Sequence, residues 1–210
     1  MSRGPHRRAS SGRRQSTWSL RFARNVLLWL LPVVLIWLLI TPFYNRFLTR
    51  STENLVRLVE SPAVTRLLVH DRHHFLITRT DVPASRGSLG SVNVSNTHFP
   101  LIMLGAFFLA VPGAGWRSRL GRLGWALLIA VFFHIISLCF WVQFIYATQL
   151  GSWSVEHYPT WQQNFWGLGK HLLDLPLKFA LPVGLWAAFY LRHLMAQPAS
   201  ASPHLAVRKK

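Results

Sequence analysis

His134, Cys139 and Gln143 are polar residues within one long apolar segment, 123–148, and are the first candidates for chemistry. Polar groups at membrane depth are costly and are commonly functional. A cysteine with a histidine suggests a thiol nucleophile and its base. Their spacing of five residues places them about 140° apart around a helix, so His134 does not activate Cys139 within this segment. Gln143, four residues after Cys139, shares its face.

His134 and Cys139 also have a structural interpretation. We expect His134 to make an interhelical hydrogen bond that fixes helix register, with a proton relay or a partner contact as the alternative. Cys139 lies between Leu138 and Phe140. A thiol needs a nearby cation or water to become a thiolate, so we expect Cys139 to be a packing residue.

A second cluster, at residues 70–74, contains three histidines and Asp71, which are ligand types that zinc uses. It falls on the predicted tip of a hairpin, where a short turn cannot easily aim these groups at one point. We therefore expect an exposed polar turn and no metal site. The chain also lacks a P-loop, a dinucleotide-binding glycine pattern, a serine-hydrolase elbow and a zinc-protease motif. No cofactor and no catalytic centre are predicted.

The composition places these residues in a membrane protein. Of 210 residues, 51% are hydrophobic and only 14% are charged, whereas soluble domains carry about 25% charge. The net charge of +17 would suggest nucleic acid if the basic residues formed one soluble face. They mostly flank apolar segments, which favours membrane topology and anionic lipid over a nucleic-acid partner.

Four apolar segments predict an all-α polytopic membrane protein with four transmembrane helices. They cover residues 25–44, 99–116, 123–148 and 171–191, and a bilayer requires roughly 20 residues. The first segment lacks a small-residue cleavage site, so we expect an uncleaved anchor rather than a signal peptide. The ends, residues 1–24 and 192–210, are expected to be disordered, and an organellar transit peptide is the alternative for the first of them.

Basic residues predict the orientation. Residues 1–24 contain seven Arg and the short loop 117–122 contains three, and such residues accumulate on the cytoplasmic side. Both termini are therefore expected in the cytoplasm. Segments 45–98 and 149–170 then lie outside, and the second of them is rich in aromatic residues that favour the headgroup layer. A docking platform for a partner is the alternative role for these rings, which are Trp153, Tyr158, Trp161 and Trp166.

The outer segment 45–98 predicts a small insertion of one helix and a β-hairpin between the first two spans. Arg50 and Arg57 belong to a charged stripe opposite an apolar face, so we expect an amphipathic helix along the membrane surface that ends at Pro62. Residues 64–69 and 75–80 alternate and are rich in β-branched side chains, which is typical of a hairpin. A third short strand is expected near Val92.

Short motifs in a fixed order carry a resemblance to a known family. They are Thr41-Pro42-Phe43-Tyr44, Asn96-Thr97-His98-Phe99-Pro100-Leu101, Leu109-Ala110-Val111-Pro112 and Phe133-His134. With the anchor, the outer segment and the Arg-rich loop, this order resembles the exosortase H-associated membrane proteins of Gram-negative bacteria over residues 25–192. The resemblance implies a companion of an exosortase, an inner-membrane transpeptidase that processes proteins with a C-terminal Pro-Glu-Pro-type signal. The exosortase's catalytic cysteine does not carry over, since Cys139 lacks the small, polar surroundings of that motif.

We therefore expect a non-enzymatic accessory protein of the bacterial inner membrane whose outer segment contacts an integral membrane partner. Residues expected at that contact are Arg50, Arg57, Asn96, His98 and His134. Capping of the second span is the alternative role for Asn96 and His98. Two other functions stay open: a membrane-embedded hydrolase or transpeptidase that uses Cys139 with His98 or His134, and a small transporter subunit.

Overall fold

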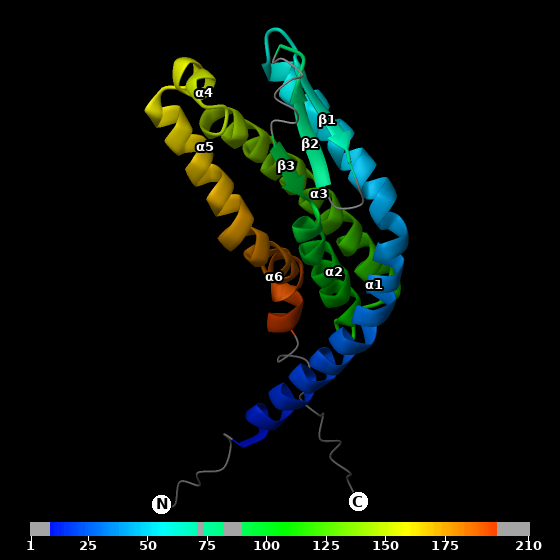
Figure 1. Cartoon of the computed structure of the whole chain (residues 1–210). Helices are drawn as coiled ribbons and strands as arrows, with labels where there is room; N and C mark the ends of the chain where they lie inside the picture. The colour runs from blue at the N-terminus through cyan, green and yellow to red at the C-terminus, as the bar shows by residue number, and fades with distance from the viewer. Residues whose placement is uncertain (1–8, 71–73, 82–89, 197–210) are drawn as a thin grey trace, which may run out of the picture.

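The structure is a computed structural model and describes residues 9–70, 74–81 and 90–196. It is a helical bundle with a small sheet toward one end, and the first turns of α1 extend past the end of α6 at the other (Figure 1). The elements in chain order are α1 (Ala9–Val59), β1 (Thr65–Val69), β2 (His74–Arg79), β3 (Gly90–Asn93), α2 (Ser95–Ala110), α3 (Trp116–Thr148), α4 (Ser152–His157), α5 (Thr160–Leu172), the π-helical turn η2 (Leu173–Leu177) and α6 (Lys178–Ala196).

Three segments of the described chain are long and apolar enough to cross a membrane, namely Trp18–Val59, Trp116–Thr148 and Thr160–Leu191. The remaining predicted span, residues 99–116, corresponds to a shorter apolar helix, which runs from the sheet to the start of α3. The helix there, α2, has 16 residues. It rises about 24 Å, less than the hydrocarbon thickness of about 30 Å.

The end of α2 explains its length. Val111 is extended, as is favoured for a residue before a proline, here Pro112. Side chains bond two carbonyls left at this end: Arg119 donates to the carbonyl oxygen of Leu109 at 2.8 Å, and Asn25 donates to that of Ala110 at 3.2 Å. The predicted loop 117–122 is thus wrong, because these residues form the first turns of α3 and Arg119 reaches back from there.

Helix α1 is continuous over three segments that the sequence predicts separately: a disordered tail, a membrane span and a surface helix. The predicted disordered tail, 1–24, is helical from Ala9 onward, and the predicted surface helix continues the span without a break. Proline at 42 removes the backbone donor that would bond the Leu38 carbonyl, and the hydroxyl of the preceding residue, Thr41, donates to the Trp37 carbonyl at 2.7 Å. Beyond the predicted span, α1 packs one face on β1.

The predicted hairpin and third strand are confirmed as a three-stranded antiparallel sheet in the order β1-β2-β3. Thr65 lies opposite Arg79, and Phe75 lies opposite Val92. Alternation along the strands turns apolar side chains inward, and the buried ones are Leu67, Phe75, Ile77 and Val92. Residues 71–73 of the histidine-rich turn lie outside the described residues.

Carboxylates of α1 hold the edge of this sheet. The backbone amide of Leu67 donates to Glu53 at 3.0 Å, and that of Thr65 donates to Glu60 at 3.0 Å. The amides of an edge strand otherwise form a template for pairing with another chain. The two acids therefore protect β1 and tie the sheet to the outer end of α1.

The fourth predicted span is part of a longer, kinked unit. The predicted outer loop, 149–170, contains α4 and most of α5, so it is mainly helical. The segment then widens into η2 at Pro176 before α6 begins. Proline cannot donate its backbone bond, and a π-helical turn accommodates such an interruption inside a helix.

Candidate functional site

A buried polar cluster joins α1, α2 and α3 inside the apolar bundle. The Tyr44 hydroxyl lies 2.6 Å from Nδ1 of His134, and Nε2 of His98 lies 2.9 Å from Oδ1 of Asn45. All four side chains are buried. Adjacent residues of α1 thus bond one histidine from each of the two neighbouring helices.

Aromatic contacts fix these rings in place. Trp37 contacts Tyr44 and His98 edge to face, with ring centroids 5.1 and 5.5 Å apart, and Tyr44 lies 6.2 Å from each histidine ring. Edge-to-face packing in this distance range is favourable. The cluster is therefore a rigid crossing point of three helices.

His134 retains one unbonded polar atom. Its Nε2 is buried and has no hydrogen-bond partner among the described residues. Lys178 of α6 and His98 lie near enough to interact electrostatically with the ring. The structure thus places the two histidines predicted at a partner contact inside the protein, and His134 makes the interhelical bond that its position predicts.

The other two intramembrane candidates lie apart from this cluster. Cys139 is half-buried against the core and makes no hydrogen bond to another described residue. Gln143 accepts a hydrogen bond from the Tyr158 hydroxyl at 3.1 Å. The structure shows no hydrogen-bonded cysteine–histidine pair in the described chain.

The remaining predicted residues lie toward the outer end. Arg50 is exposed on α1, and Arg57 pairs with Glu53 at 3.3 Å one turn earlier. Asn96 belongs to the first turn of α2, and its side chain is outside the described part.

A stacked arginine organises that outer end. The Arg79 guanidinium lies over the rings of Tyr146 and Trp153, 4.7 and 4.6 Å from their centroids. It donates two hydrogen bonds to Asp81 at 2.8 and 2.9 Å. Burial opposes the charge of Arg79, but the bonds and the charge of Asp81 outweigh it and raise the pKa of Arg79. The hydrogen bonds from Arg79 lower the pKa of Asp81.

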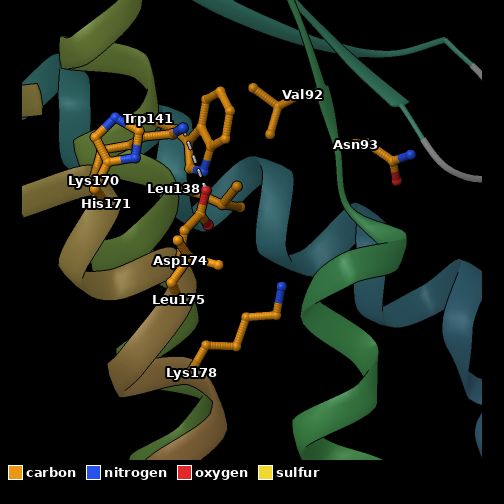
Figure 2. A pocket seen from close by; sticks show the side chains of 9 residues that line it. All are labelled: Val92, Asn93, Leu138, Trp141, Lys170, His171, Asp174, Leu175 and Lys178. Carbon is orange, nitrogen blue, oxygen red and sulfur yellow. Dashed lines mark ion pairs between the residues drawn. The ribbon is translucent and has the colours of Figure 1, made fainter.

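Sequence reasoning missed a pocket of about 340 Å³ between α3, β3 and the α5–α6 unit. It is lined by Val92, Asn93, Leu138, Trp141, Lys170, His171, Asp174, Leu175 and Lys178. Figure 2 shows the ion pair between Lys170 and Asp174, which spans 3.6 Å. The Lys170 ammonium also lies 4.0 Å from the centroid of the Trp141 ring. The spacing of Lys170, Asp174 and Lys178 by four residues could have indicated this pocket, because it places them along one helical face.

A family model described as "Exosortase H-associated membrane protein" matches residues 18–193. The chain belongs to this family. The match covers the bundle, the sheet, the buried polar cluster and the pocket. The expected resemblance is therefore confirmed, and with it the identity of a membrane protein associated with exosortase H. The chain has no significant match among curated proteins or solved structures.

Proposed function

We propose that this protein is a non-enzymatic accessory subunit of the bacterial inner membrane that binds an exosortase-type sorting transpeptidase. The description of its family as exosortase H-associated carries the proposal. Both termini are cytoplasmic in this arrangement, because the seven Arg of residues 1–24 and the three of 117–122 favour the cytoplasmic side. The sheet then faces the periplasm.

The use of the polar residues supports a scaffold role. His134 and His98 bond to neighbouring residues of α1, and such interhelical bonds set helix register. Cys139 packs against the core without a hydrogen-bonded base in the described chain. These buried hydrogen bonds therefore hold together the helices from which the outer sheet extends.

The outer part of α1 offers a surface for the partner. Arg50 is exposed there and forms no ion pair with another described residue. Phe43 and Phe47 precede it by seven and three residues, so they share its side of the helix, and they are 71% and 52% exposed. Arginine beside apolar side chains is typical of protein interfaces. Glu53 and Glu60 hold this surface and the sheet as one unit.

Affinity purification of the tagged full chain in mild detergent tests the proposal. We expect an exosortase-type enzyme to co-purify in stoichiometric amount. Arg50→Glu reverses a charge at the proposed surface and should reduce recovery roughly fivefold or more. Arg117→Glu makes the same change on an exposed residue at the opposite end and should leave recovery unchanged. Purification of the protein alone, or equal loss in both variants, would contradict the proposal.

Cys139→Ala separates the accessory role from catalysis by this chain. As a packing residue, Cys139 is expected to tolerate alanine, and cells that carry the variant should process exosortase substrates at the wild-type rate. Loss of processing with normal amounts of the variant and normal partner recovery would instead assign a catalytic thiol.

A further inference from the structure

The pocket between α3 and the α5–α6 unit contains one more positive charge than negative charge. Three of its lining residues are charged: Lys170, Asp174 and Lys178. Lys170 and Asp174 form an ion pair with each other. Lys178 forms no ion pair with another described residue, and Figure 2 shows its side chain extending into the pocket toward α2. The ammonium of Lys178 lies 5.6 Å from the centroid of the Phe179 ring and has no anionic partner among the described residues.

The depth of this charge makes an anionic ligand favourable. Lys178 lies in the middle third of the membrane-crossing segment Thr160–Leu191. A cation at membrane depth is costly unless it is paired or reaches the interface. The π-helical turn η2, of a type often found at functional sites, immediately precedes Lys178. Its neighbour in the pocket, His171, adds a further hydrogen-bonding group.

Apolar side chains continue from the pocket along the outside of the bundle. Leu175 lines the pocket and is 59% exposed, and Phe179 follows one turn later at 54% exposed. Phe179 contacts Phe99 of α2 edge to face, with centroids 6.2 Å apart. A charged pocket thus opens onto an exposed apolar track at membrane depth.

We propose that this pocket binds the phosphodiester headgroup of an anionic phospholipid, with Lys178 as its counter-ion and the Leu175–Phe179 track against an acyl chain. A phosphodiester carries one negative charge, which matches the single unpaired ammonium. A volume of about 340 Å³ is at the small end of ligand pockets and fits a headgroup while the chains remain in the membrane. Basic pockets between membrane helices bind anionic headgroups in this way. The proposal does not depend on the exosortase partner.

Native mass spectrometry of the delipidated full chain tests this site with three probes: phosphatidylglycerol, phosphatidylcholine and inorganic phosphate. We expect the protein to bind phosphatidylglycerol about tenfold more tightly than phosphatidylcholine. Lys178→Gln should abolish this preference, whereas Lys178→Arg should retain it. Arg66→Gln removes a charge from an exposed residue of β1 and should retain it as well.

Three results would overturn the proposal. A Lys178→Gln protein that elutes like the wild type and keeps the preference would place the lipid elsewhere. Binding of inorganic phosphate as tight as that of phosphatidylglycerol would exclude a role for the acyl track. A Lys178→Gln protein that keeps the lipid preference but no longer recovers the exosortase would assign the pocket to a protein carboxylate instead.

Discussion

The hydroxyl of Tyr44 and Nδ1 of His134 are 2.6 Å apart and join residues separated by 90 positions in the chain. Tyr44 follows Pro42, where α1 lacks one backbone bond, and His134 lies midway along α3. The next residue, Asn45, bonds His98 of α2. One turn of α1 thus fixes its register against both neighbouring helices.

Tyr44→Phe removes this bond and keeps the ring. We expect the free energy of unfolding in mixed micelles to fall by about 1 kcal/mol, the usual size of an interhelical bond in a membrane protein. A double-mutant cycle with His134→Leu should give a coupling energy of similar size, about 1 kcal/mol. Additive effects of the two substitutions would show that the bond contributes nothing to stability.

Gly169 lets α5 approach α3. A Cβ at this position would overlap the ring of Phe140, which is itself packed against Phe165 and Trp166. Gly169→Ala should therefore lower stability by about 1–3 kcal/mol, as for overpacked cores. Gly184→Ala is the matched control, because a Cβ there meets nothing within 4 Å. Its thermal midpoint should equal or exceed that of the wild type, and an equal loss in both variants would contradict the packing argument.

The Arg79–Asp81 pair predicts a loss of stability in acid. The pKa of Asp81 is lowered in the folded protein by its bonds to Arg79, from the ordinary value of 3.8. The pair therefore stabilises the fold above that value, and the stabilisation is lost as the pH falls through the lower folded pKa. Thermal midpoints measured between about pH 2 and pH 5 should fall less steeply for Asp81→Asn than for the wild type. If the midpoints of the two proteins fall in parallel, the Arg79–Asp81 pair does not contribute to the loss of stability in acid.

Thiol labelling tests which end of the bundle faces outward. Ser91 of β3 and Ser118 of α3 are both exposed and lie toward opposite ends. In a Cys139→Ala background, a membrane-impermeant maleimide added to spheroplasts should label Ser91→Cys and spare Ser118→Cys. The reason is the group of Arg residues beside Ser118, which favours the cytoplasmic side. The reverse pattern would invert the proposed orientation.

Local patterns predicted the outer sheet correctly. The alternation around Leu67 and Ile77 defines which face is buried, so it also defines the register of β1 against β2. The family resemblance was likewise readable, because short motifs such as Phe133-His134 occur in a fixed order. These features depend on residues close together in the chain.

Features that depend on distant residues could not be predicted. Hydropathy alone placed residues 99–116 in one span, but the helix ends at Ala110, where Arg119 folds back to its carbonyls. A charge pattern likewise marked Arg119 as a loop residue. The pocket at Lys178 forms only where α3 and β3 pack near the α5–α6 unit, which comes later in the chain. No local sequence pattern indicates this contact.

The short helix α2 has a consequence for how the chain is inserted during synthesis. It packs against α1, α3 and α6, and buried residues such as Leu104 and Phe108 follow one another along it. Two of these neighbours, α3 and α6, leave the ribosome after α2 does. The last packing contacts of α2 therefore form only after α6 has been synthesised. A chain that stops before α6 would leave the face of α2 that packs on α6 uncovered.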